Sequence, residues 1–184
     1  MRTFIAVDLD KEIKNNLISL LDKLKKKGEN IKWVRQQGMH LTIKFIGEIK
    51  EEKISEIEKI LRKISEGHKP FSLKIIGTGF FPHEKKNPRV LWAGVEADET
   101  LASLQKELES DLESIGFPRE KREFHPHLTL GRVKAPSVWE TISELQKYKE
   151  STFGEMIANK ITFFRSILKP SGAEYIILSE HQLK

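Results

Sequence analysis

The sequence predicts an α+β fold of two pseudo-symmetric lobes, each an antiparallel sheet with outer helices, that enclose a central cleft. Two observations carry this prediction: a short motif occurs twice, and helices and strands follow each other in the same order around both copies. The copies lie 87 residues apart, close to half of the 184-residue chain. No segment is long enough to act as a linker between independent domains, so we expect one bilobal domain over residues 1–184.

The repeated motif is His-Leu-Thr followed by an apolar residue. It occurs at residues 40–43 and 127–130, both times in segments whose alternating and β-branched character predicts a strand. Side chains at positions i and i+2 of a strand share a face, so each copy places an imidazole beside a hydroxyl, His40 with Thr42 and His127 with Thr129. The chain has only six histidines, and two such matched pairs exceed what chance would give.

Apolar residues at helical spacing predict the helices between these strands. The predicted apolar faces are Ile13, Leu17, Leu20, Leu21 and Leu24; Ile54, Ile57, Ile60, Leu61 and Ile64; and Leu101, Leu104, Leu108 and Leu112. A fourth helix is expected over about 137–149. Further strands are expected over 3–9, 31–34, 71–79, 89–95, 161–168 and 175–179, with a loop at 81–88 and a turn at 170–172.

Composition limits the class of protein. The hydrophobic fraction is 38%, and no apolar run approaches the ~20 residues needed to span a bilayer, so we expect a globular protein in the cytoplasm without a membrane partner. Cysteine is absent, which excludes disulfides, zinc ribbons and thiolate catalysis. The net charge of +5 favours anionic partners such as nucleic acid, although a solvated charged surface explains it equally well.

Two imidazoles that face each other across a cleft suit in-line displacement at phosphorus. One can deprotonate the attacking oxygen while the other protonates the leaving oxygen. The hydroxyls of Thr42 and Thr129 can donate hydrogen bonds to the non-bridging phosphate oxygens, where charge grows in the transition state. A single strand histidine is most often a structural one, but packing gives no reason for Thr to recur two residues after both His40 and His127.

A metal site is the alternative for these residues. His125 and His127 share a strand face, and His40 opposite would complete a three-histidine zinc site. Against this, the position that corresponds to His125 in the first motif is Gly38. Loss of activity in chelator would favour the metal site.

Strand alternation also places the residues after each motif. Lys44 continues the face of His40 and Thr42, so it either points at a phosphate or is a solvated edge lysine. Phe45 and Arg132 fall on the opposite face, which predicts Phe45 in the core. Arg132 reaches the cleft only if its strand twists or bulges.

Three residues flank the predicted loop at 81–88. Phe81, Arg89 and Trp92 would allow a base to be stacked or clamped, while core packing of Trp92 and solvation of Arg89 are equally consistent with the sequence. A non-catalytic RNA-binding module that uses the cleft and the basic charge is therefore the alternative to an enzyme.

With these motifs in view, the chain resembles the two-histidine phosphoesterase superfamily, and specifically its RNA 2′,3′-cyclic phosphodiesterase branch, long called 2′-5′ RNA ligases. The resemblance covers nearly the whole chain. It rests on Arg-Thr-Phe-Ile-Ala-Val at 2–7, His-Leu-Thr-Ile-Lys-Phe-Ile-Gly at 40–47, Arg-Val-Leu-Trp-Ala-Gly-Val at 89–95 and His-Pro-His-Leu-Thr-Leu-Gly-Arg at 125–132.

The resemblance implies an enzyme that needs no metal, ATP or other cofactor. It would open a terminal RNA 2′,3′-cyclic phosphate to a 2′-phosphomonoester, with 2′-5′ ligation as a related reaction. We expect a monomer whose partners are RNA ends with a 2′,3′-cyclic phosphate, tRNA fragments among them. The matching catalytic positions are His40 and His127, with Thr42, Thr129 and Arg132 contacting substrate. The family pattern makes His40 the acid to the departing O3′ and His127 the base to water, an order that two nearly identical motifs cannot reveal.

Overall fold

The protein is described by a computed structural model that covers residues 1–28, 30–83, 87–170 and 172–184. In chain order its strands and α-helices are β1 (Arg2–Asp8), α1 (Lys11–Lys25), β2 (Ile31–Trp33), β3 (His40–Glu48), α2 (Ile54–Gly67), β4 (Phe71–Phe81), β5 (Val90–Ala97), α3 (Glu99–Ser114), β6 (His127–Val133), α4 (Trp139–Gln146), β7 (Thr152–Ala158), β8 (Lys160–Lys169) and β9 (Gly172–Gln182). Short 3-10 helices, η1 (Gln36–Gly38) and η2 (Glu51–Lys53), precede β3 and α2.

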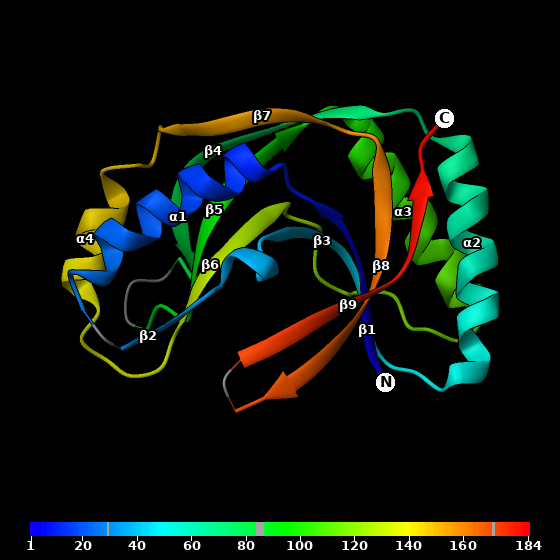
Figure 1. The fold of residues 1–184 in the computed structure, drawn as a ribbon, viewed down its shortest axis with the longest axis horizontal. Helices are drawn as coiled ribbons and strands as arrows, with labels where there is room; N and C mark the ends of the chain where they lie inside the picture. The colour runs from blue at the N-terminus through cyan, green and yellow to red at the C-terminus, as the bar shows by residue number, and fades with distance from the viewer. Residues whose placement is uncertain (29, 84–86, 171) are drawn as a thin grey trace.

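The strands form two antiparallel sheets, which confirms the predicted α+β class (Figure 1). Sheet A has the order β3-β1-β8-β9, and sheet B has the order β2-β6-β5-β4-β7. The strand that begins with His40 is an edge strand of sheet A, whereas the strand that begins with His127 lies inside sheet B between β2 and β5. The two motifs therefore belong to different sheets.

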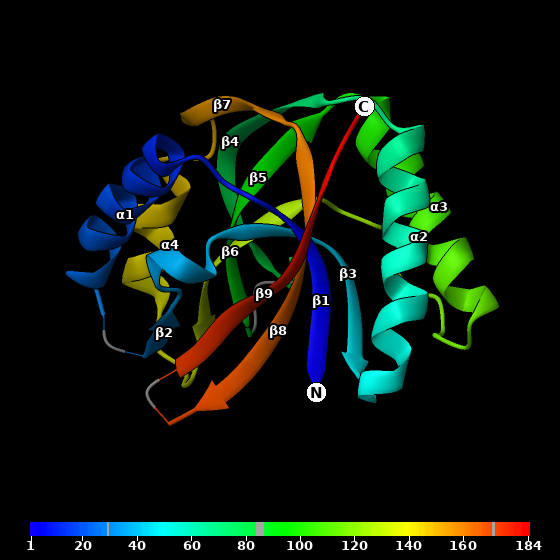
Figure 2. The ribbon, with the colours of Figure 1, turned by 45° about the vertical axis from the view of Figure 1, so that its right-hand side comes forward.

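The helices cover the two sheets in pairs. Helices α2 and α3 pack together beside sheet A, and helices α1 and α4 pack together against sheet B, as Figure 2 shows. Helix α1 follows β1 of sheet A along the chain but packs against β7 of sheet B, while α3 follows β5 of sheet B but packs against β3 of sheet A. Each lobe is therefore assembled from both halves of the sequence.

The helical faces predicted from periodicity form the core. All five predicted positions of α1 and all four of α3 are buried. In α2 the central positions Ile57, Leu61 and Ile64 are buried, and Ile54 and Ile60 pack at the edge of the same cluster. Within the described ranges, no helix has both the length and the apolar composition that a bilayer span requires.

Both motif strands contain a bulge just after the threonine. In β3, Thr42 pairs with Ala6 and Lys44 with Ile5, so Ile43 has no partner of its own on β1. In β6, Thr129 pairs with Trp92 and Gly131 with Leu91, so Leu130 has no partner of its own on β5. An extra residue reverses the alternation of faces beyond it, and this decides where the residues after each motif point.

One strand was not predicted, and one predicted strand has a distant partner. Residues 31–33 form β2, as predicted, and β2 pairs with β6 of sheet B and not with the neighbouring β3 of sheet A. Strand β7 was not predicted, because its pattern is weakly apolar and Gly154 interrupts it at φ 146°. The predicted loop at 81–88 and turn at 170–172 include residues 84–86 and 171, which lie outside the described residues.

Candidate active site

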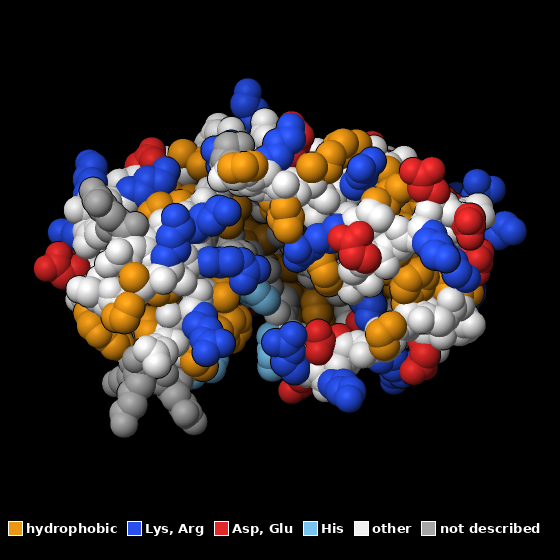
Figure 3. Space-filling view, turned by 90° about the horizontal axis from the view of Figure 1, so that it is seen from below, with side chains coloured by type: hydrophobic (Ala, Val, Ile, Leu, Met, Phe, Trp, Pro, Cys, Tyr) orange, Lys and Arg blue, Asp and Glu red, His pale blue; other side chains and the backbone are white. Residues whose placement is uncertain are grey.

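The two His-Leu-Thr motifs lie on strands that approach each other from different sheets. Strand β3 carries His40 and Thr42, strand β6 carries His127 and Thr129, and the two strands are in contact. All four side chains are partly buried. Figure 3 shows a hollow between the two lobes with His side chains at its edge and Lys and Arg side chains around its rim, and we call this hollow the central cleft.

His40 is surrounded by aromatic rings. Its imidazole stacks on Phe4 with 4.7 Å between ring centroids and lies 5.6 Å from the ring of Phe164. The ring of Tyr175 meets His40 edge-on at 5.1 Å. These three residues come from β1, β8 and β9, so strands distant in sequence enclose the imidazole.

This enclosure controls the ionisation of His40. Burial lowers the pKa of His40 from 6.5 to about 4, because the charged imidazolium loses solvation among the rings. Asp8, which pairs with His40 across the β1–β3 ladder, raises the pKa, and Lys14, which forms an ion pair with Asp8 at 2.6 Å, lowers it. At neutral pH the imidazole of His40 is therefore uncharged and can accept a proton.

His127 is oriented by the backbone. Its Nδ1 lies 2.7 Å from the carbonyl oxygen of His125, and a carbonyl can only accept a hydrogen bond, so Nδ1 carries the hydrogen. This leaves Nε2 as the nitrogen that gains or loses a proton. The ring of Phe81 meets the imidazole edge-on at 5.3 Å, so each motif histidine has an aromatic neighbour.

Trp92 lies beside the second motif and not in the interior. It pairs with Thr129 and therefore shares the cleft face of β6, and its ring lies 5.3 Å from that of Phe81. Gly79 makes room for the indole, because a Cβ at that position would meet the ring at 2.2 Å. Arg89 is exposed, and its carbonyl accepts a hydrogen bond from the amide of Val133. Phe81 and Trp92 thus lie beside the motif, and Arg89 lies near the C-terminal end of β6.

Both predictions for Lys44 are wrong, because the bulge at Ile43 turns its side chain inward. Lys44 is 5% exposed, and its Nζ lies 2.6 Å from Oε2 of Glu109 on α3 and 2.8 Å from the carbonyl oxygen of Pro118. The prediction of a core position for Phe45 is also wrong: Phe45 pairs with Phe4 on the cleft face and is 48% exposed. The guanidinium of Arg2 lies over the Phe45 ring, 4.7 Å from its centroid.

Arg132 reaches the cleft by the bulge that the sequence analysis required. Beyond Leu130 the alternation of β6 is reversed, so Arg132 shares the face of His127 and Thr129. Burial raises the pKa of the Tyr175 hydroxyl, while the positive charges of Arg132 and Arg2 act in the opposite direction. Arg132 on sheet B therefore acts electrostatically on Tyr175 of sheet A across the cleft.

Gly131 lets β2 pass closely, because a Cβ there would lie 2.6 Å from Ile31.

No grouping of side chains suited to a metal ion is found in the described part of the chain. His125 is largely exposed, with Nε2 3.7 Å from Glu123, and it does not join His40 and His127 in a three-histidine set. Two other histidines each lie beside a carboxylate: Nε2 of His68 contacts Glu107, and Nε2 of His181 contacts Glu58.

Sequence reasoning did not find Phe4, Phe164 and Tyr175 as neighbours of His40. Phe4 stood in a segment used for the family resemblance, but no local pattern links three aromatic residues from three strands. The only available signal was the apolar character of each strand.

Two antiparallel sheets that bring together one His-Leu-Thr strand each define a two-histidine phosphoesterase. The sequence model of the family described as "LigT like Phosphoesterase" matches residues 7–92 and 94–175, and each segment contains one motif. The chain belongs to this LigT-like phosphoesterase family.

Relatives match over almost the whole chain, and a solved structure shares its fold. The RNA 2′,3′-cyclic phosphodiesterase of Thermotoga maritima is 39% identical over 185 residues, covering 100% of this chain and 96% of the relative. The RNA 2′,3′-cyclic phosphodiesterase of Methanothermobacter thermautotrophicus is 37% identical, covering 95% of both chains. The crystal structure of TT0787 of Thermus thermophilus superposes with a TM-score of 0.86 at 30% identity, covering 100% of this chain and 98% of that one.

Proposed function

We propose that this protein is an RNA 2′,3′-cyclic phosphodiesterase that hydrolyses a terminal cyclic phosphate to a 2′-phosphomonoester. The observation that carries the proposal is the contact between β3 and β6, which brings a His/Thr pair from each sheet to one cleft. The names of the full-length relatives support the same reaction. Both motif strands come from one chain, so we propose that a monomer, one bilobal unit over residues 1–184, is sufficient.

In the proposed reaction a water oxygen attacks phosphorus opposite O3′. One histidine takes the proton from water as the new P–O bond forms, and the other gives a proton to O3′ as the P–O3′ bond breaks. The products are a 2′-phosphate and a free 3′-hydroxyl, and the two histidines exchange protonation states. Bulk solvent restores them before the next turnover.

The remaining residues are proposed to hold the phosphate. Thr42 and Thr129 lie beside the two histidines and donate hydrogen bonds to the non-bridging oxygens. Arg132, on the same face as His127, adds a positive charge to the cleft. Charge-assisted hydrogen bonds to phosphate are stronger than neutral ones, so Arg132 contributes to substrate binding.

The ionisation of the free protein favours His40 as the base and His127 as the acid. His40 is neutral at neutral pH because its pKa is about 4, so it can accept the proton of water. The carbonyl of His125 accepts from Nδ1 of His127 and fixes the orientation of the ring that is proposed to protonate O3′. This order is the reverse of the one that the family pattern implies, and a substrate whose leaving group needs no proton separates the two.

The function is tested by incubating the purified protein, in the presence of chelator, with a short RNA that ends in a 2′,3′-cyclic phosphate. We expect a 2′-phosphomonoester product, and loss of about 10²- to 10⁴-fold in kcat/KM for His40→Ala and His127→Ala. His125→Ala is the matched control, because only the backbone of His125 contacts the site. Parental rates in either motif variant would contradict the assignment.

The second candidate is a non-catalytic RNA-binding module. The net charge of +5 and the Lys and Arg side chains around the cleft favour it. In that case the protein binds RNA with strong salt dependence, does not distinguish a cyclic phosphate from a 3′-hydroxyl end, and releases no product.

A further inference from the structure

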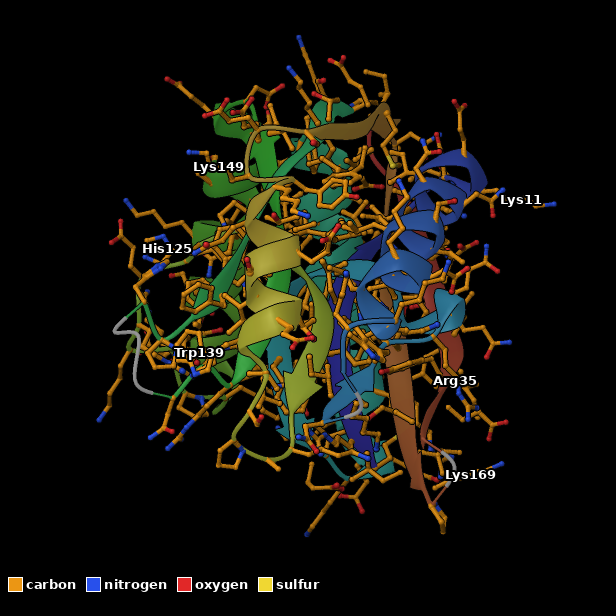
Figure 4. The ribbon with its side chains drawn as sticks, turned by 90° about the vertical axis from the view of Figure 1, so that its left-hand side faces the viewer. Lys11, Arg35, His125, Trp139, Lys149 and Lys169 are labelled. Carbon is orange, nitrogen blue, oxygen red and sulfur yellow. The ribbon has the colours of Figure 1, made fainter. Side chains whose placement is uncertain are left out.

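An exposed tryptophan lies at the end of β6 that is opposite the motif. Trp139 is the first residue of α4 and is 50% exposed, although large aromatic side chains are usually buried. Figure 4 shows Trp139 at the surface, on the same side of the molecule as His125, which precedes β6. Packing into the core therefore does not account for a tryptophan at this position.

Trp139 borders a hollow with positively charged walls. The hollow has a volume of about 220 Å³ and is lined by residues 87–89, just before β5, and by residues 133–139, at and after the end of β6. Its charged lining residues are Arg89 and Lys134. Both cations are exposed, and neither forms an ion pair with a carboxylate among the described residues. Unpaired cations beside an exposed aromatic ring are the pattern that binds single-stranded nucleic acid.

The loop that presents Trp139 is held in one conformation. The amide of Lys134 donates to the carbonyl of Asn30 at 2.8 Å, and the side-chain amide of Asn30 donates to the carbonyl of Pro136 at 3.1 Å. Ser137 adopts a left-handed φ of 77°, and Val138 is buried. A non-glycine residue in this conformation is maintained only where its surroundings fix it, and such strain clusters at ligand sites.

The hollow lies at the C-terminal end of β6, the strand that begins with the second motif. His127 begins the strand and Val133, which lines the hollow, ends it, so the two are about 20 Å apart at about 3.4 Å per residue. Arg132 lies between them on the cleft face. Successive nucleotides of a stacked strand are also about 3.4 Å apart, so about six nucleotides cover this distance.

We propose that the hollow bounded by Arg89, Lys134 and Trp139 binds the single-stranded RNA upstream of the reacting end. A base stacks on Trp139, and backbone phosphates lie against Arg89 and Lys134. This inference rests on the proposed function, because the cyclic phosphate at the two histidines sets the position of the rest of the strand.

The test compares 2′,3′-cyclic AMP with a ten-nucleotide oligoadenylate that ends in a 2′,3′-cyclic phosphate. We expect kcat/KM to be about tenfold or more higher for the decamer, since base stacking on an aromatic side chain and phosphate contacts add to binding. Trp139→Ala lowers the decamer-to-mononucleotide ratio about tenfold, and Trp139→Phe retains most of it. Arg89→Gln and Lys134→Gln also lower the ratio and weaken its dependence on salt.

The matched controls are Ile157→Ala and Lys149→Gln. Ile157 is an exposed apolar residue on β7, at the opposite edge of sheet B, and Lys149 is an exposed lysine that Figure 4 places away from Trp139. Neither control changes the ratio. An equal ratio in the wild type and Trp139→Ala, with both substrates hydrolysed, overturns this inference and leaves the proposed function intact.

Two other outcomes are decided by direct measurement. If neither substrate is hydrolysed, the proposed function fails, and fluorescence anisotropy of a labelled decamer then tests the RNA site alone: weaker binding to Trp139→Ala supports it, and equal binding overturns it. If Trp139→Ala only converts a dimer to a monomer in sedimentation, the tryptophan contacts a second copy of the chain and the inference is wrong.

Discussion

The imidazole of His40 stacks on the ring of Phe4, with 4.7 Å between centroids and 26° between planes. Neutral rings stack in this way at little cost, but an imidazolium in the same place loses its water. The cost of this lost hydration is the physical reason that the pKa of His40 lies near 4. The same contact therefore affects both the stability of the fold and the chemistry of the cleft.

His40 makes the folded state sensitive to acid. Between pH 6.5 and about 4 the unfolded chain binds a proton at His40 that the folded chain does not, so stability falls as pH falls through this window. The expected loss in unfolding free energy is about 3 kcal/mol, because each unit of pKa difference between the folded and unfolded chain corresponds to about 1.36 kcal/mol. Urea unfolding of the wild type and His40→Phe at pH 7 and pH 4.5 measures it. The variant should lose less stability over this range, and equal losses would contradict the buried neutral imidazole.

The order of acid and base is tested with a leaving group that needs no proton. In a 2′,3′-cyclic phosphorothiolate the 3′ oxygen is replaced by sulfur, and a thiolate departs without protonation. We expect His127→Ala to recover at least about 100-fold of its lost kcat with this substrate, since acid catalysis contributes 10²- to 10⁴-fold. His40→Ala should recover nothing. Recovery by His40→Ala alone would support the order implied by the family pattern.

The two threonines are expected to act on the transition state. Replacement of Thr42 or Thr129 by Val keeps the shape but removes the donor, and each change should lower kcat about 100-fold with little effect on KM. Thr→Ser at the same positions should retain most activity. Thr152→Val, on the exposed face of β7, is the control. A change confined to KM would show that the hydroxyls bind substrate and transition state equally.

Arg132 is expected to bind the substrate as a charge and as a planar donor. Arg132→Ala should raise KM about tenfold, and Arg132→Lys should recover only part of this loss, because an ammonium does not reproduce the bidentate geometry of a guanidinium. The effect should shrink as salt is added. Arg122→Ala is the control, since Arg122 is exposed and paired with Glu120. Equal kinetics for Arg132→Ala and Arg122→Ala would exclude a substrate contact.

Lys44 is expected to stabilise the fold without a role in chemistry. Its ion pair with Glu109 is buried on both sides, so Lys44→Met leaves an uncompensated carboxylate and should cost about 3–5 kcal/mol in unfolding free energy. The double variant Lys44→Met/Glu109→Leu should recover much of this loss. Chemical denaturation measures both. A loss of activity in a folded Lys44→Met variant would contradict this prediction and indicate that Lys44 acts in the cleft.

The elements that sequence predicts well are those with a strong local period. The apolar faces of α1, α2 and α3 depend only on spacing, and the structure confirms them. Lys44 and Phe45 were placed wrongly because one extra residue at Ile43 reverses every later position, and no residue type marks a bulge in advance. Arg132 shows the same effect on the other motif strand, and it was predicted to reach the cleft only through such a bulge.

The sequence did not predict which distant strands pair with each other. Strand β2 pairs with β6, about a hundred residues later, and Phe164 and Tyr175 join His40 from the end of sheet A. These contacts depend on which sheets the strands enter. A periodic pattern describes the faces of one element and contains no information about its partner.

The entry of β8 and β9 into sheet A has a consequence for biosynthesis. Both motifs leave the ribosome before Phe164 and Tyr175 do, so a nascent chain that already holds His40 and His127 cannot yet enclose the first imidazole. Until those strands are added, only the ring of Phe4 among the three can cover the imidazole. The aromatic enclosure of the first motif is therefore completed only after Tyr175 has left the ribosome.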